Sequence, residues 1–266
     1  MNKQSWTKAE INFVLKLHAR GLSRKEITRQ FNEKFETIRS QDSIKHCIDV
    51  HGDTIEKYTP KVLILDIETR SLTVKTFGLK DQNIGLEQVV DDGGILCWSA
   101  KWLGTDKVFF EETKGIKSKE KVILKKLKKL MDEADIILGQ NSQSFDVPIV
   151  TGLFLYYDLI DEVRDFKQID TLRMSRSKYK FLSHKLQYMS GKLCEIKKQT
   201  HAKFPGMSLW MEYEAKNPLA FAEMKKYNMA DVEATEELFL KLAKGCKTKL
   251  VTDALRAYVA NRKTKK

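Results

Sequence analysis

Asp66 and Glu68 follow a run of four aliphatic residues, Val62 to Leu65, which Pro60 introduces. A short aliphatic run of this kind is typical of a strand that is buried on both faces. Residues two apart on a strand project from the same face, so the two carboxylates would lie about 7 Å apart along it. Buried carboxylates need a positive partner, and a divalent cation is the simplest one. Alternatively, the strand ends here and both acids are solvated.

Asp231 and Tyr227 lie in a stretch with helical spacing near the other end of the sequence. Residues four apart on a helix share a face, and this face continues through Thr235. Asp231 would therefore lie beside an inward-facing stripe, where an acidic residue again needs a cation. The alternative is an ordinary exposed helix residue. A third polar group, Asn141 with Asp146, follows another short aliphatic run.

The elements that would carry these residues alternate between strand and helix patterns. The expected strands are residues 62–69, 95–102, 107–111 and 135–139, and the expected helices begin at Ser118 and span residues 149–157 and 217–244. Residues 70–94 are expected to form a long irregular excursion, a helix is expected through Tyr188 and Met189, and residues 191–212 give mixed signals. Three strands followed by a helix and a strand predict a mixed α/β sheet with acids at the strand ends.

Residues 1–56 have the pattern of three short helices. Thr7 and Glu10 form a capping box before the first helix, and Ser23 caps the second. The third helix is expected at residues 41–51. Three short helices with a glycine after the first predict a compact helix-turn-helix unit.

Length and composition limit the class of protein. The 266 residues suit one sizeable domain and a small one, and 42% hydrophobic residues allow a real core. The formal net charge of +12 favours a polyanionic partner. The sequence has neither a signal peptide nor an apolar run long enough for a membrane helix, so we expect no membrane partner and a prokaryotic or viral-host cytoplasm. The four cysteines are far apart in the sequence and form no metal-binding pair. Residues 247–266 are expected to be a basic tail.

Three motifs now stand in order: Asp66-Ile67-Glu68-Thr69, then Asn141-x4-Asp146 with Phe145 before the acid, then Tyr227-x3-Asp231. This set resembles the DEDD 3′–5′ exonucleases of the ribonuclease H-like superfamily over residues 60–246. The tyrosine four residues before the last acid is typical of the DEDDy branch, because the histidine branch would have histidine where this sequence has Lys226. The stretch from Asp170-Thr171-Leu172 through Met207-x2-Trp210 to Tyr227-Asn228 further resembles stand-alone, phage-like members.

The resemblance implies hydrolysis of phosphodiester bonds by two Mg²⁺ or Mn²⁺ ions. Asp66, Glu68 and Asp231 would hold the ion that carries the attacking water. Asp66 would also bridge to the second ion, which Asp146 would reach through water. Tyr227 would orient the attacking water, because a phenol with an unperturbed pKa of about 10 is a poor base at neutral pH.

The resemblance also implies residues that bind the terminal nucleotide. Thr69, Asn141 and Phe145 are the positions of this sequence that would do so. Simple core packing is the alternative for Phe145.

The first part of the chain resembles the Myb/SANT-like tri-helical family. The resemblance rests on Trp6, Leu17, Gly21-Leu22-Ser23, Glu26-Ile27, Phe31-Asn32, Arg39-Ser40 and Ser43-Ile44-Lys45. In that family the third helix enters the major groove of DNA, and here this helix would present Gln41, Asp42, Lys45 and His46. The alternative is a SANT-type module that binds protein.

Together these patterns predict a metal-dependent 3′–5′ exonuclease that acts on DNA rather than RNA, with a replication or repair protein as a candidate partner. An RNA-processing exonuclease is the nearest alternative, and a contact to the 2′-hydroxyl would distinguish the two. A DNA-binding regulator with a relic nuclease fold is the alternative from another class. The third alternative is a nuclease that is recruited by protein contacts, with the SANT-like module as the adaptor.

Overall fold

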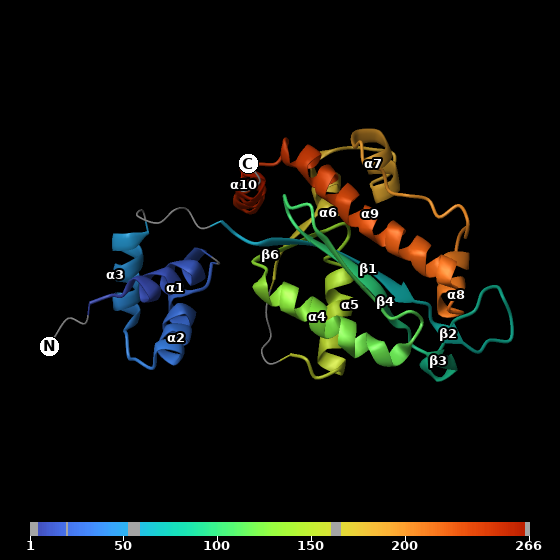
Figure 1. The fold of residues 1–266 in the computed structure, drawn as a ribbon, viewed down its shortest axis with the longest axis horizontal. Coiled ribbons are helices and arrows are strands. Elements are labelled where there is room, and N and C mark those ends of the chain that lie inside the picture. The colour runs from blue at the N-terminus through green and yellow to red at the C-terminus, as the bar shows by residue number, and fades with distance from the viewer. Residues whose placement is uncertain (1–4, 20, 53–58, 161–165, 264–266) are drawn as a thin grey trace. The chain divides into compact units, whose positions relative to one another are not determined.

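The computed structural model describes residues 5–19, 21–52, 59–160 and 166–263 (Figure 1). Its contacts divide the chain into two compact units, Met1–Pro60 and Lys61–Lys266. The predicted α/β fold with a small three-helix unit is confirmed. In the described parts of the chain, no helix is long and apolar enough to cross a membrane.

The first unit consists of α1 (Lys8–Ala19), α2 (Arg24–Phe35) and α3 (Gln41–His51). The local signals of the sequence determine where these helices begin. Thr7 and Glu10 exchange capping hydrogen bonds of 2.7 to 3.2 Å, and the Ser23 hydroxyl accepts from the backbone N–H of Glu26. The three helices enclose one small core, made of Val14, Leu17, Ile27, Phe31, Ile44 and Cys47.

Arg39 and Asn32 fix the turn between α2 and α3. The Asn32 amide donates to the Arg39 carbonyl at 3.0 Å, and its oxygen accepts from the Arg39 N–H at 2.8 Å. The Arg39 guanidinium lies 4.2 Å from the centre of the Trp6 ring and 3.8 Å from a carboxylate oxygen of Glu10. Arg39 therefore stabilises this unit from within and is not a free cation on its surface.

The second unit is built on a five-stranded mixed sheet in the order β5-β4-β1-β6-β7. Its strands are β1 (Val62–Arg70), β4 (Gly94–Trp102), β5 (Val108–Glu112), β6 (Ile136–Gly139) and β7 (Lys167–Asp170). β1 pairs antiparallel with β4 and parallel with β6, so the aliphatic strand is central, as its buried pattern requires. A short pair, β2 (Thr73–Val74) and β3 (Val89–Asp91), lies within the expected irregular excursion, beside the one-turn helix η1 (Leu86–Gln88).

Helices cover both faces of the sheet (Figure 1). The odd-numbered residues Leu63, Leu65 and Ile67 of β1 pack with α4 (Glu120–Glu133) and α5 (Asp146–Tyr156), and the one-turn helix η2 (Lys117–Lys119) precedes α4. The even-numbered residues Val62 and Ile64 pack against α9 (Pro218–Ala243). Because side chains alternate along a strand, the next even-numbered residues, Asp66 and Glu68, also face α9.

Several elements differ from the sequence-based expectations. Residues 247–266 were expected to be a basic tail, and this was wrong: α10 (Lys249–Lys263) buries Val251, Ala254 and Ala257 in the core that contains Val62 and Ile64. Its apolar residues recur at helical spacing among the basic ones. The strand β7 and two short helices were not predicted, namely α6 (Thr171–Lys178) and α8 (Ser208–Glu214). The helix expected through Tyr188 and Met189 corresponds to α7 (Leu186–Leu193).

Candidate active site

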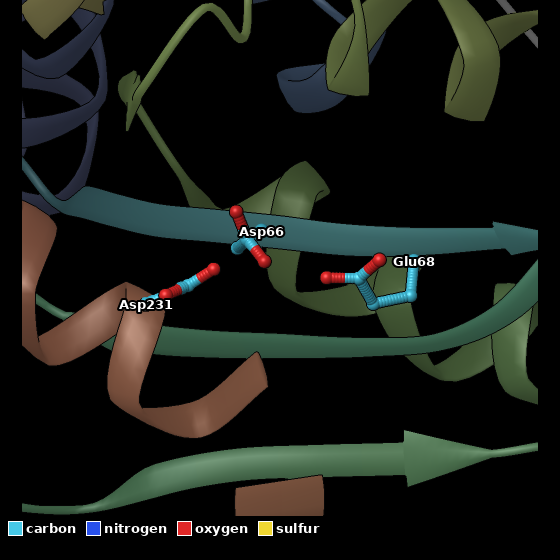
Figure 2. A group of neighbouring side chains, drawn as sticks. All are labelled: Asp66, Glu68 and Asp231. Atoms are coloured by element: carbon cyan, nitrogen blue, oxygen red, sulfur yellow. The ribbon is translucent and has the colours of Figure 1, made fainter. Parts of the chain in front are cut away.

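Three carboxylates converge between β1 and α9. Asp66 and Glu68 occupy the even positions of β1 that follow Val62 and Ile64, and Asp231 comes from the facing side of α9. One ligand oxygen from each of the three lies within 4.8 Å of the others. Figure 2 shows Asp66 and Glu68 side by side on the strand, with Asp231 reaching toward them from the helix. The alternation of the strand thus brings the two sequence-predicted acids to the third.

Asp146 lies close to this group but outside the set of three. It is the first residue of α5, and its side chain is only 3% exposed. Its Oδ1 accepts a hydrogen bond of 3.0 Å from the backbone N–H of Ile67, the residue between Asp66 and Glu68. Its charge also raises the pKa of both of these acids. Asp146 is therefore an electrostatic neighbour of the cluster and is fixed to the same strand.

The cluster strongly favours bound protons or cations. Burial raises the pKa of Asp66 well above its ordinary value, and the charges of Asp231, Asp146 and Glu68 raise it further. Burial raises the pKa of Glu68 to about 8, although Lys198 opposes this change. The pKa of Asp231 is raised for the same reason and against the same opposing charge. Carboxylates this close together cannot all be ionised in a buried site without a positive partner.

These donors fit a hard divalent cation. All four acids offer oxygen ligands, which Mg²⁺ and Mn²⁺ prefer, and none of the four offers sulfur or nitrogen. The Oδ1 atom of Asp231 is buried and has no hydrogen-bond partner in the described part of the chain. A buried carboxylate oxygen without a donor is costly unless a ligand reaches it. The residues that could hold a metal ion are therefore Asp66, Glu68 and Asp231, with Asp146 beside them.

Neighbouring polar groups orient the acids. The amide Nδ2 of Asn228, fully buried on α9, donates to Asp66 Oδ2 at 2.6 Å and to the Asp66 carbonyl at 3.3 Å. The Trp210 indole N–H donates to Glu68, which lowers the pKa of that carboxyl. The sequence did not indicate these roles. Asn228 lies next to Tyr227, and this adjacency is the one local signal that could have suggested a role for Asn228.

Lys198 is a further residue that sequence reasoning missed. Its ammonium forms an ion pair with Asp231 Oδ2 and lies 4.2 Å from the centre of the Tyr227 ring. Burial alone would lower the pKa of Lys198, but its electrostatic interactions with Asp231, Tyr227 and Asp66 raise it above its ordinary value. Lys198 is therefore a permanent cation at the edge of the acidic cluster.

Tyr227 lies in an aromatic group beside the acids. Its ring is 5.2 Å from that of His201 and 6.0 Å from that of Trp210, measured between ring centres. Burial raises the pKa of Tyr227 to about 12, and Lys198 opposes this only in part. The phenol is thus protonated at neutral pH and can donate a hydrogen bond, but it cannot act as a base.

The three sequence-predicted substrate residues differ in exposure and in surroundings. Thr69 follows Glu68 at a register shift of β1 and is partly buried. Asn141 has a positive φ of 63° and donates its backbone N–H to Asp170 at 3.0 Å. Phe145 is 40% exposed, so core packing does not account for it.

Two pockets are lined in part by Asn141 or by Tyr227 and Lys198. A pocket of about 590 Å³ is lined by Asn141 together with Gln140, Leu172, Arg176, Leu182, Ser183, His184, Lys185 and Leu186. A smaller one, of about 310 Å³, is lined by Tyr227 and Lys198 with Gln187 and residues 199–202, 205 and 206. Both are large enough to hold part of a nucleotide.

The predicted DNA-binding residues belong to the first unit. Gln41, Asp42, Lys45 and His46 are all exposed on α3. Two acidic residues, Asp42 and Asp49, share the exposed surface of this helix with Lys45. The side chains that would contact DNA are therefore accessible, but they do not form a uniformly basic surface.

Comparison with known proteins gives two findings. A family model described as the RNase H superfamily matches residues 63–243. Among solved structures, the chain is similar to a family B DNA polymerase from the hyperthermophilic archaeon Pyrobaculum calidifontis, with 16% sequence identity and a TM-score of 0.44. The match covers 76% of this chain and 28% of the polymerase, so the chain spans little more than a quarter of that protein's length. No curated protein matches the chain.

Proposed function

This chain belongs to the RNase H superfamily, and we propose that it is a metal-dependent 3′–5′ exonuclease of the DEDDy type, acting on DNA. The observation that carries the proposal is the convergence of Asp66, Glu68 and Asp231 within 4.8 Å, beside Asp146 and a protonated Tyr227. Nucleases that hydrolyse phosphodiester bonds with two divalent ions use a carboxylate set of this kind.

Asp66, Glu68, Asp146 and Asp231 would hold the ions. When bound, Mg²⁺ or Mn²⁺ supplies an activated water and neutralises the charge that develops on the phosphate and the leaving oxygen. Asn228 holds the Asp66 carboxylate in place by its hydrogen bond of 2.6 Å.

The remaining site residues would position the reactants. Tyr227 donates its phenolic hydrogen to the attacking water and so orients it. Thr69, Asn141 and Phe145 would contact the terminal nucleotide, and Phe145 has an exposed ring on which a base can stack.

DNA is proposed as the substrate, with RNA as the alternative. The formal net charge of +12 supports a nucleic acid of either kind. The resemblance of the first unit to Myb-like modules supports DNA, with Gln41, Lys45 and His46 exposed on α3 for contact. The rival view of this unit as a protein-binding adaptor draws support from the two acids on the same helix surface.

Digestion of end-labelled oligonucleotides tests the reaction. The purified protein with Mg²⁺ should shorten a 5′-labelled single strand as a ladder and release labelled mononucleotide at once from a 3′-labelled strand. Parallel reactions on duplex DNA and on RNA of the same sequence identify the substrate. Cuts in a circular single strand would show an endonuclease, and activity in excess EDTA would exclude the metal mechanism.

A further inference from the structure

Lys198 places an ammonium group directly on one of the metal-ligand candidates. The side chain of Asp231 is only 2% exposed, and Lys198 shields it from solvent while keeping 22% exposure of its own. The ammonium bonds to Asp231 Oδ2 and also lies over the Tyr227 ring. A cation on an aromatic face and a buried carboxylate together make a specific site for this group.

The backbone around Lys198 is fastened to the two helices that flank the site. The Lys198 N–H donates to Ser190 Oγ on α7 at 3.0 Å. Just before it, the N–H groups of Glu195 and Ile196 donate to the Glu237 carboxylate on α9 at 3.0 and 2.9 Å. Five intervening residues on α9 separate Glu237 from Asp231. The ammonium is therefore directed to Asp231 by an anchored segment, unlike that of an ordinary surface lysine.

An ammonium on Asp231 Oδ2 and a divalent cation on the free Oδ1 of the same carboxylate would repel each other, so each weakens the binding of the other. We propose that Lys198 is a built-in counterion that competes with the metal ion for Asp231 and so sets how tightly the site binds metal. The inference rests on the proposed function, because it takes Asp66, Glu68 and Asp231 as metal ligands. The pocket of about 310 Å³, which Lys198 and Tyr227 line, gives the displaced ammonium a place beside the site.

The test measures binding of Mn²⁺ alone, without nucleic acid, by isothermal titration calorimetry at an alkaline pH that keeps the carboxylates ionised. Lys198→Met keeps the length of the side chain and removes its charge. Since the coupling free energy between two occupied sites typically corresponds to about 5–150-fold in affinity, the variant should bind Mn²⁺ more tightly by a factor in this range. Lys198→Arg keeps a cation and should bind Mn²⁺ no more tightly than the wild type.

Lys197→Met is the matched control. It changes the net charge equally at the adjacent, exposed residue, so its Mn²⁺ affinity should equal that of the wild type. Unchanged or weaker binding by Lys198→Met would overturn the proposal, and so would equal gains in both methionine variants. If Lys198→Met fails to fold, Lys198→Gln replaces it with the same expected gain.

Thermal unfolding gives a second measurement that needs no activity. Removing Lys198 leaves Asp231 without its counterion, so Lys198→Met should have a lower Tm than the wild type in EDTA and a larger rise of Tm on adding Mn²⁺. Failure of the exonuclease proposal is distinguishable from failure of this one. Tighter Mn²⁺ binding by the variant with no cleavage by the wild type would refute only the former, and normal cleavage with no gain in affinity would refute only the latter.

Discussion

Replacing Asp146 by asparagine should stabilise the metal-free protein, and the gain should grow as the pH rises. Burial raises the pKa of Asp146 from 3.8 to about 7, against the opposing hydrogen bond from the Ile67 N–H. An amide keeps the oxygen that accepts this hydrogen bond and resembles the protonated acid in shape. It never becomes a buried charge.

The pKa fixes the direction and size of the effect. Below pH 3.8 the folded and unfolded chains both carry the proton on Asp146, so this group adds no pH dependence there. Between pH 3.8 and about 7 only the folded chain keeps the proton, and its stability falls as the pH rises. A pKa difference of about 3 at roughly 1.4 kcal/mol per unit gives about 4 kcal/mol in favour of Asp146→Asn above pH 8.

Urea unfolding in EDTA at several pH values measures this difference. Tryptophan fluorescence follows mainly the second unit, which contains Trp98, Trp102 and Trp210. The exposed Asp92→Asn is the control, and its stability should follow that of the wild type at every pH. Parallel pH curves for the wild type and Asp146→Asn, or a less stable variant above pH 8, would refute the electrostatic account of this site.

Further experiments test other residues of the site and the role of the first unit. Asp66→Ala or Asp231→Asn should abolish cleavage while circular dichroism shows an intact fold, since removing one acid lowers the repulsion among the remaining carboxylates; an active Asp66→Ala protein would contradict the two-metal mechanism. Asn228→Ala should weaken Mn²⁺ binding in calorimetry by about 10–100-fold, as loss of a ligand-orienting group typically does, and unchanged affinity would show that this hydrogen bond is dispensable. Deleting residues 1–57 should flatten the dependence of log DNA affinity on log salt by about 0.7–0.9 for each lost phosphate contact and leave the maximal rate unchanged. Lys45→Glu should reproduce part of this effect, whereas identical slopes for the truncated and intact proteins would favour the adaptor role.

Elements whose signals are local were predictable. The three helices of the first unit begin at caps such as Ser23 and Ser40, and these side chains accept hydrogen bonds from residues three positions on. β1 was predictable because a short aliphatic run is typical of a buried strand, and α9 because a long stretch with helical periodicity is typical of a helix with one buried face. The convergence of Asp66, Glu68 and Asp231 followed the resemblance, and the alternation along β1 explains it physically.

The parts that escaped prediction depend on distant partners. β7 has only four residues, and it forms because β6 offers it a parallel edge. Lys198 lies in a segment without periodicity, and its position follows from hydrogen bonds to Ser190 and Glu237 in two different helices. Asn228 meets Asp66 across 162 residues of sequence. Apart from the bond between Lys198 and Ser190, which are eight residues apart, the partners of these contacts are too far apart to lie in one short window of sequence.

Because Asp66 and Asn228 are far apart in the sequence, the ribosome synthesises them at different times. At about 5–20 residues per second, a ribosome needs roughly 8–32 s to make the 162 residues between them. During that interval the nascent chain displays the two acids of β1 without the helix that completes the set. We therefore expect an unfinished chain to be unable to degrade nucleic acid. Ribosome-bound chains stalled before residue 218 should be inactive in a cleavage assay, whereas chains with α9 outside the exit tunnel should gain activity.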